Sequence, residues 1–283
     1  MTITLNSYTL NYFDGKQQKK IASVNNQLRE VKVPSKSVQK SYSLIIPAYN
    51  EENRIAGFLK SLSPFIFSFD EILAICDGND KTAEIIKTEI PRIKVVEYEK
   101  RLGKGGAILE GFRLAQGDVI GYVDADGSIS PEDALRVFAS VNSDTSVSIG
   151  SRWLKDSKVL NKQPLTRIIL GRLYHYLAFT LLGIREKDIQ CGVKAFNKEL
   201  IEALQSKVTV KNFSFDTAVL FHCKKMFKKI SEVPISWKDV SGSRVNPLRE
   251  SIVMFATLIG LFLANSKRMN VFFNRLFEVD IGI

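Results

Sequence analysis

The 283-residue chain has 45% hydrophobic and 25% charged residues, a composition typical of a globular protein with a proper core. Three widely spaced cysteines and two histidines argue against a disulfide framework, a zinc site and a histidine-rich metal centre. The net charge of +10 lies at the two ends: residues 1–40 have 7 Lys/Arg against 2 Asp/Glu, residues 222–283 have 10 against 5, and residues 41–221 have 23 of each. Basic ends suit an anionic membrane surface. No helix-turn-helix, zinc-finger or aromatic-basic motif supports binding to nucleic acid.

Apolar runs of strand length alternate with helical segments after a polar extension at residues 1–40. Strands are expected over 42–46, where Pro47 stops the run, and over 71–76, 94–98 and 118–123. Helices are expected from Asn50 or Glu51 to about Leu62, over 81–89 and over 105–116. This alternation predicts an α/β fold with a mostly parallel central sheet and helices on both faces. Ligands of such sheets bind at the carboxyl ends of the strands.

The strongest single feature is Asp124-Ala125-Asp126-Gly127, which directly follows the fourth expected strand. Strand alternation places the Asp124 and Asp126 side chains on the same side. Two neighbouring carboxylates repel each other unless a cation lies between them, and hard oxygen ligands favour Mg²⁺ or Mn²⁺. Alone the motif is also compatible with a surface turn that has two solvated acids.

Polar clusters follow the other expected strands. Residues 47–52 (PAYNEE) end the first strand, and Asp77-Gly78 ends the second. Residues 101–106 (RLGKGG) form a glycine-rich basic turn before a helix, where backbone N–H groups and Lys104 can meet anionic oxygens. The turn is neither a Walker loop nor a GxGxxG dinucleotide motif. Together these strand ends predict a metal and diphosphate site.

The sequence resembles family 2 glycosyltransferases of the GT-A fold. Within this family it is most similar to the group of dolichyl-phosphate β-glucosyltransferases and dolichyl-phosphate mannose synthases. The resemblance runs from about Tyr42 to about Leu258 and rests on the ordered set IIPAYNEENRI, ICDGNDKTAEII, RLGKGGAILEGF, VDADGSISPED, IGSRW, GIREKDIQCGVKAF, FSFDTAVL and EVPISWKDVSGS. It implies a basic extension at 1–40, a GT-A catalytic domain at 41–240 and a membrane-associating amphipathic segment at 241–283.

The resemblance also implies roles for individual residues. The nucleotide-sugar pocket would comprise Pro47, Tyr49, Glu51, Asp77, Lys104, Asp124 and Ala125. Mg²⁺ or Mn²⁺ would be held by Asp124, Asp126 and Ser128. The catalytic set would comprise Asp124, Asp126, Arg152, Arg167, Asp188 and Gln190, with the two arginines meeting a phosphate. The usual acidic pair of the second turn reads Cys76-Asp77 here, and an apparent insertion at Glu186-Lys187 leaves open whether Asp188 or Glu186 is the functional acid.

The implied reaction is an inverting transfer of a hexose to a polyprenyl or dolichyl phosphate, with UDP-glucose favoured as donor and GDP-mannose second. The alternatives are a dolichyl-phosphate mannose synthase and a glycosyltransferase acting on a non-lipid glycan. A processive synthase would have QxxRW, but no glutamine precedes Arg152-Trp153 at that spacing. A non-catalytic binding protein would be expected to lose part of the acidic pair, and a nucleotidyltransferase would have a glycine-rich first loop.

The C-terminal part carries an uncharged apolar run at Ser251–Ser266, which is shorter than the roughly 20 residues needed to span a bilayer. A lipid acceptor favours an interfacial helix over Pro247–Ser266, with lipid-facing Phe255, Leu258, Phe262 and Leu263 and with Lys267, Arg268 and Arg275 meeting phosphates. The first twenty residues lack the apolar core of a signal peptide. The expected location is therefore the cytoplasmic face of a membrane, as a peripheral or monotopic protein. Asp216 is expected to be a helix cap, Trp153 and Trp237 packing residues and Cys191 a core residue.

Overall fold

The computed structural model describes residues 10–14, 17–24, 27–31, 40–161, 163–240 and 247–265. The chain divides into two units, Met1–Lys40 and Ser41–Ile283. The first unit contains a three-stranded antiparallel sheet in the order β1-β2-β3, formed by Leu10–Asp14, Gln17–Val24 and Gln27–Val31. The predicted basic extension therefore contains regular strands.

The second unit is built on a seven-stranded sheet in the order β11-β8-β10-β7-β4-β5-β6. Its strands are β4 (Tyr42–Ala48), β5 (Glu71–Cys76), β6 (Lys94–Glu97), β7 (Val119–Val123), β8 (Val147–Ser151), β10 (Val193–Asn197) and β11 (Ile230–Pro234). All neighbouring strands pair in parallel except β10, which is antiparallel to both β7 and β8. The sheet is thus mostly parallel, as predicted. A two-stranded sheet pairs β9 (Lys158–Asn161) with β12 (Ser236–Lys238).

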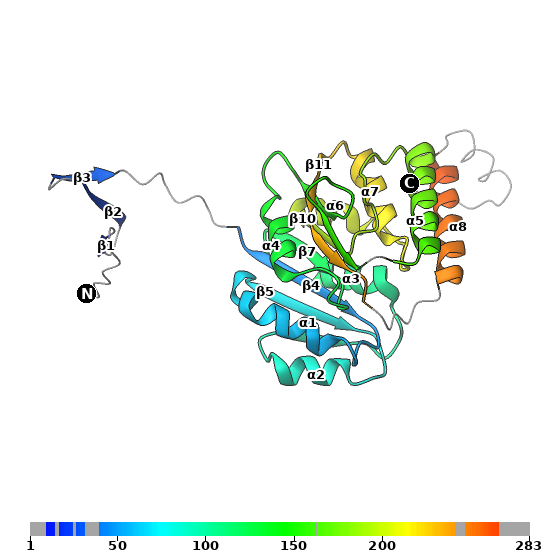
Figure 1. The fold of residues 1–283 in the computed structure, drawn as a ribbon, viewed down its shortest axis with the longest axis horizontal. Coiled ribbons are helices and arrows are strands. Elements are labelled where there is room, and N and C mark those ends of the chain that lie inside the picture. Colours follow the sequence, from blue (N-terminus) through cyan, green and yellow to red (C-terminus); the bar gives the residue numbers. More distant parts are fainter. Residues whose placement is uncertain are drawn as a thin grey trace. The chain divides into compact units, whose positions relative to one another are not determined.

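Helices cover both faces of the large sheet (Figure 1). One face packs against α1 (Ile55–Leu62), η1 (Ser63–Ser68), α2 (Thr82–Glu89) and α4 (Pro131–Ala139). The other packs against α3 (Gly103–Leu114), α5 (Leu165–Leu177), η2 (Ala178–Leu182), α6 (Lys198–Gln205), α7 (Phe215–Lys225) and α8 (Pro247–Asn265). The strand side chains alternate between the two cores: Leu44 and Ile46 enter the first, and Ile45 enters the second.

Two local differences from the predicted elements shape the edge where the strands end. β4 continues through Pro47, because its pairing with β7 ends at Ile45 and beyond that residue a proline removes no ladder bond on that side. The first helix begins at Ile55 rather than at Asn50 or Glu51. Asn50 has a left-handed φ of 54°, and its side-chain oxygen accepts a hydrogen bond from Asn79 N at 2.9 Å. Residues 50–54 are therefore held as a turn above the sheet.

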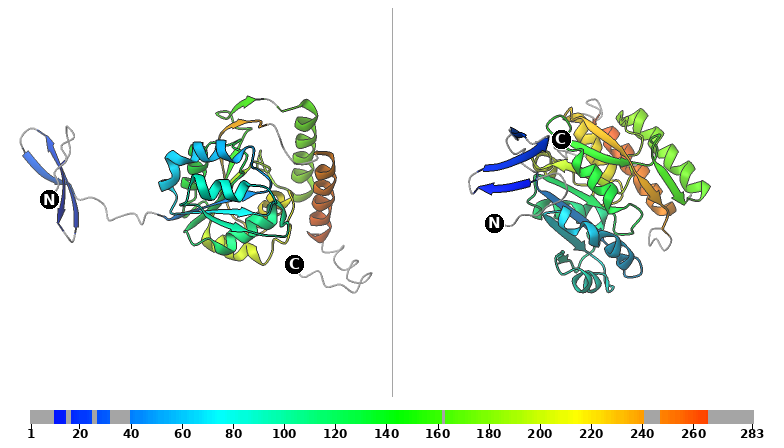
Figure 2. Two further views of the ribbon diagram at one scale, coloured as in Figure 1. Left: turned by 90° about the horizontal axis from the view of Figure 1, so that it is seen from below. Right: turned by 60° about the vertical axis from the view of Figure 1, so that its left-hand side comes forward.

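The helices α5 and α8 lie side by side at one side of the second unit (Figures 1 and 2). Met254 and Leu258 of α8 are buried, and Phe255 stacks edge-on against Tyr174 at 5.5 Å between centroids. The predicted lipid-facing role of Leu258 is therefore wrong, because this side chain belongs to the core, and Phe255 also packs against it. No helix within the described part of the chain is long and apolar enough to cross a membrane.

Candidate active site

Two cavities open at the carboxyl edge of the parallel strands. The smaller one, of about 170 Å³, is lined by Pro47, Ala48, Tyr49, Glu51, Arg54, Asp77, Arg101, Gly103, Lys104, Ala107, Asp124, Ala125, Asp126 and Phe213. The larger one, of about 430 Å³, extends between α5 and α8 and includes Ser128, Arg152, Arg167, Asp188 and Gln190 in its wall. Both cavities share Arg54, Lys104, Asp124, Asp126 and Phe213. The acidic pair therefore stands where the two cavities meet.

Backbone contacts, and the absence of a side chain at Gly192, hold the acidic pair in place. Asp124 N donates to Gly192 O at 2.9 Å, and a Cβ on Gly192 would lie 2.2 Å from an Asp124 carboxylate oxygen. Only glycine at position 192 leaves room for that carboxylate. Asp126 Oδ1 accepts the backbone N–H of Ser128 at 2.9 Å across a turn in which Gly127 has a φ of 71°.

Lys104 is bound to the first carboxylate of the pair. Its Nζ lies 2.9 Å from Asp124 Oδ1 and 3.2 Å from Oδ2. Burial raises the pKa of Asp124, repulsion from Asp126 and Asp216 adds to this rise, and Lys104 opposes it. The Lys104 pKa is raised as well, because the Asp124 and Asp216 carboxylates outweigh the effect of burial. A cationic group thus already neutralises one carboxylate of the acidic pair.

The oxygen atoms at this junction suit a hard divalent ion. Within the described ranges no group of three or more His, Cys, Asp or Glu side chains converges on one point. Asp124 and Asp126 supply two carboxylates, and the buried Ser128 adjoins them in the wall of the larger cavity. Mg²⁺ is commonly bound by one or two carboxylates together with phosphate oxygens and water. The residues therefore fit an ion that a diphosphate completes.

Glu51 and Tyr49 form one side of the smaller cavity. Glu51 makes a two-pronged ion pair with Arg54, with both N–O distances at 2.6 Å. Burial raises the pKa of Glu51; Arg54 opposes this rise, and the charges of the acidic pair add to it. Arg101 lies over the Tyr49 ring at 3.9 Å from its centroid. This wall thus presents a stacked aromatic ring beside a guanidinium and a carboxylate.

Asp77 positions the glycine-rich turn. Its Oδ2 accepts the backbone N–H groups of Leu102 at 2.8 Å and Gly103 at 2.9 Å. Gly103 has a left-handed φ of 76°, and α3 begins there rather than at Gly105. Lys104 consequently lies in the first turn of α3 and reaches the acidic pair. The Asp77 carboxylate faces the smaller cavity and also holds its rim.

A buried network that the sequence analysis did not find lies behind Lys104. Lys194, the second residue of β10, is fully buried; its Nζ donates to Cys191 O at 2.8 Å and forms an ion pair with Asp216. Asp216 also accepts from the Tyr122 hydroxyl and lies 3.3 Å from Lys104 Nζ. Burial alone would raise the pKa of Asp216, but the two lysines lower it below its usual value.

The expectation that Asp216 caps a helix is wrong. The residue that precedes α7 is Ser214, and it makes no side-chain capping bond. Asp216 lies in the first turn of α7 with its side chain pointing to the two lysines. One signal in the sequence could have indicated this buried network: a lysine lies between Val193 and Ala195 in a mostly apolar strand. A buried ammonium requires a carboxylate partner.

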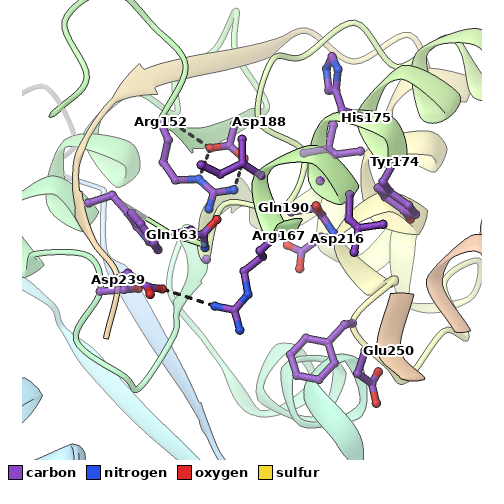
Figure 3. A pocket seen from close by; sticks show the side chains of 18 of the residues that line it. Arg152, Gln163, Arg167, Tyr174, His175, Asp188, Gln190, Asp216, Asp239 and Glu250 are labelled. Carbon is purple, nitrogen blue, oxygen red and sulfur yellow. Dashed lines mark hydrogen bonds and ion pairs between the residues drawn. The ribbon is translucent and has the colours of Figure 1, made fainter. Parts of the chain in front are cut away.

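Arg152 and Asp188 form a second buried pair (Figure 3). Asp188 accepts from Arg152 Nε at 2.7 Å, from Nη2 at 2.8 Å and from the backbone N at 2.9 Å. The Arg152 guanidinium also lies 5.3 Å from the Trp237 ring centroid. Glu232 of β11 accepts the backbone N–H groups of Lys187 and Asp188 and so fixes this loop. Asp188 lines the larger cavity, whereas Glu186 is not among its lining residues.

Arg167 and Gln190 make weaker contacts in the same cavity. Arg167 Nη1 lies 3.5 Å from Asp239 Oδ1, with 38% and 26% of the two side chains exposed (Figure 3). Gln190 Nε2 lies 3.7 Å from the Met254 sulfur. Arg167 is thus held more weakly by its aspartate partner than Arg152 is by Asp188. Trp237 is buried as expected, and Trp153 is 42% exposed beneath Arg172.

A family model and several known proteins are similar to this chain. The model of the family described as "Glycosyl transferase family 2" matches residues 43–205. The chain is 31% identical over 237 residues to a dolichyl-phosphate beta-glucosyltransferase of Dictyostelium discoideum, covering 77% of this chain and 72% of that protein. It is 30% identical over 259 residues to one of Saccharomyces cerevisiae, covering 80% and 77%.

Similar folds are found among solved structures. Glucosyl-3-phosphoglycerate synthase of Mycobacterium tuberculosis, in complex with Mn²⁺, UDP-glucose and phosphoglyceric acid, aligns with a TM-score of 0.62 at 20% identity over 80% of this chain and 79% of that one. Mannosyl-3-phosphoglycerate synthase of Rubrobacter xylanophilus aligns with a TM-score of 0.60 at 16% identity, covering 77% and 73%. At these identities the likeness establishes the fold.

Proposed function

The chain belongs to glycosyltransferase family 2 and has its GT-A fold, and on that premise we propose that it transfers glucose from UDP-glucose to the phosphate of a dolichyl or other polyprenyl carrier. The relatives at about 30% identity named dolichyl-phosphate beta-glucosyltransferase support this acceptor. The observation that carries the proposal is the larger cavity, which runs from the acidic pair past Arg152 and Arg167 to the helices α5 and α8.

The smaller cavity would hold the nucleoside part of the donor. Tyr49, Glu51 and Asp77 would line the base and ribose, beside Pro47 and Ala125. Asp124, Asp126 and Ser128 would hold Mg²⁺ or Mn²⁺, which when bound offsets the negative charge that gathers on the leaving diphosphate. Lys104, at the start of α3, would donate to the same phosphate oxygens together with the helix N–H groups. The sugar would then lie at the junction of the two cavities.

The acceptor phosphate would bind in the larger cavity. Arg167 suits this role, because its contact with Asp239 is long and partly exposed and a phosphate offers its guanidinium two oxygens. Arg152 would keep its pairing with Asp188 and add positive charge to the wall. A phosphate is already anionic at neutral pH, so the nucleophile needs no general base. In-line attack by this oxygen on the anomeric carbon inverts the centre and gives a β-linked product.

An exposed apolar face adjoins this cavity and suits a membrane-bound acceptor. Leu165, Ile169 and Leu173 follow one another at four-residue spacing on α5 and are 71%, 57% and 47% exposed. Further exposed apolar side chains are Tyr176, Phe179, Ile252, Ile259 and Phe262. We propose that this face lies among lipid head groups and brings the cavity to the carrier phosphate. The basic residues Lys267, Arg268 and Arg275, assigned the same role from sequence, lie outside the described residues.

The acceptor is tested with radiolabelled UDP-glucose and Mn²⁺, supplied with dolichyl phosphate in vesicles or with soluble phosphorylated and glycan acceptors. We expect label to enter the organic phase only with the lipid phosphate, and Asp126→Asn to abolish the transfer. GDP-mannose supplied in place of UDP-glucose is expected to give little product. Label transferred to a soluble acceptor, or a clear preference for GDP-mannose, would contradict this function.

The membrane face is tested by replacing Leu165, Ile169 and Leu173 with serine. Full burial of one such side chain is worth roughly 2 kcal/mol. If each is immersed by about half, the triple change costs roughly 3 kcal/mol, and sedimentation with anionic vesicles should fall at least tenfold. Phe67→Ser is the matched control, because Phe67 is 82% exposed on η1, which packs against the opposite sheet face. Equal partitioning of both variants would refute the assignment of this face.

A further inference from the structure

The contact between Lys104 and Asp124 raises a physical problem for the proposed metal site. The lysine ammonium lies within 3.2 Å of both oxygens of Asp124, which are the atoms that a divalent cation would bind. A cation of charge +2 beside an ammonium is repelled by it. Metal binding at Asp124 therefore requires that Lys104 give up at least part of this contact. The ammonium then needs another carboxylate, because its side chain is only 11% exposed.

Asp216 is placed to be that second carboxylate. Its Oδ2 already lies 3.3 Å from Lys104 Nζ, so the ammonium can shift toward it without leaving the site. Its Oδ1 is bound by Lys194 and by the Tyr122 hydroxyl, and its side chain is only 3% exposed. The carboxylate is thus fixed in place, with one oxygen directed at Lys104.

The network is balanced in charge before a metal binds. Asp124 and Asp216 carry two negative charges, and Lys104 and Lys194 carry two positive charges. If Lys194 binds Asp216 on one oxygen and Lys104 binds it on the other, Asp124 becomes available to an external cation. The fully buried Lys194, which the proposed mechanism does not otherwise use, keeps Asp216 ionised and in position.

We propose that Asp216, held by Lys194 and Tyr122, is a positioning residue that takes up the Lys104 ammonium and so allows Lys104 and a divalent cation to share the site at Asp124. This inference rests on the metal-dependent function proposed above. It assigns Asp216 an effect on metal affinity that acts through Lys104. A purely local electrostatic effect of Asp216 on the cation would instead be independent of Lys104.

The test is Mn²⁺ binding to the full chain without nucleotide, measured from the electron paramagnetic resonance signal of the free ion. The variants are Asp216→Asn, Lys104→Met and the double variant. We expect Asp216→Asn to weaken Mn²⁺ binding at least fivefold, because Lys104 then competes for Asp124 alone. In the Lys104→Met background, which lacks the competing ammonium, the same change should have less than a twofold effect. Asp156→Asn, an exposed carboxylate change, is the matched control and should leave the affinity unchanged in both backgrounds.

An equal loss in both backgrounds, or no loss in either, would overturn the inference. Asp216→Asn leaves a buried ammonium with less compensation, so circular dichroism should verify that the variant folds. If it does not fold, Asp216→Asn combined with Lys194→Met removes both buried charges and is measured with and without Lys104→Met. Absence of Mn²⁺ binding by the unmodified chain, both alone and with UDP added, would overturn this inference together with the metal site. Lipid specificity would be untouched, because the transfer assay tests it separately.

Discussion

Replacement of Asp188 by alanine should reveal whether this acid is chiefly a structural partner of Arg152. The carboxylate is 1% exposed and accepts three hydrogen bonds from one arginine, two of them through the guanidinium. Removing one partner of a buried ion pair leaves the other charge uncompensated and costs about 3–5 kcal/mol. For a domain of this size about 1 kcal/mol changes the melting temperature by roughly 2–4 °C. We therefore expect Asp188→Ala to melt roughly 10 °C below the unmodified chain.

Asp239→Ala is the matched control, because it removes an aspartate from the longer and more exposed pair with Arg167. Such pairs are worth about 0–1 kcal/mol, so its melting temperature should fall by less than about 3 °C. Arg152→Met combined with Asp188→Leu should recover part of the loss, since no buried charge remains. Calorimetric melting of the three variants decides the matter. Equal melting of Asp188→Ala and Asp239→Ala, together with a large fall in transfer by Asp188→Ala, would refute the structural role and favour a catalytic acid.

Two further predictions concern the space around the acidic pair and the stability at high pH. Gly192→Ala should reduce glucose transfer at least a hundredfold with a small change in melting temperature, because its Cβ would displace the Asp124 carboxylate; Gly57→Ala, where nothing lies within 4 Å, should leave transfer unchanged. Burial raises the pKa of all three cysteine thiols to about 12 from about 9. The unfolded chain therefore releases these protons first, and the free energy of unfolding should fall by about 1.4 kcal/mol per thiol for each pH unit above 9. Urea titrations at pH 8, 9 and 10 measure this slope, and folded protein whose thiols react with iodoacetamide at pH 9 as fast as free cysteine would contradict it.

The first half of the sheet could be predicted because its signals are local. Each of the first four strands of the sheet was expected from its apolar residues, and in the structure none of their ends differs from the expected position by more than two residues. The acidic pair, Glu51, Asp77 and Lys104 were expected at one edge, and all of them line the smaller cavity. Parallel pairing makes this outcome a matter of order along the chain, since every such strand ends at the same edge.

The remainder of the site depends on contacts between distant segments. β10 returns antiparallel between β7 and β8 and carries Lys194 beneath the acidic pair, although the two lie about seventy residues apart in the chain. Asp216 is expected from the sequence to be a helix cap, because the motif around it is compatible with a helix start. Its partners come from three other segments: Lys104 at the start of α3, Tyr122 in β7 and Lys194 in β10. No spacing rule within one segment could have joined these residues.

Several acidic side chains of the site are already paired with basic ones. Four acidic groups around the two cavities each have a basic partner: Glu51 with Arg54, Asp124 with Lys104, Asp188 with Arg152 and Asp239 with Arg167. Under the proposed function, the donor diphosphate or a carrier phosphate would therefore bind by exchanging partners with these pairs. Exchange is easiest where the existing pair is longest and most exposed, which is the pair of Arg167 and Asp239. It is hardest at the buried pair of Arg152 and Asp188. We therefore expect Arg167 to bind the ligand phosphate and Arg152 to keep the cavity wall in place.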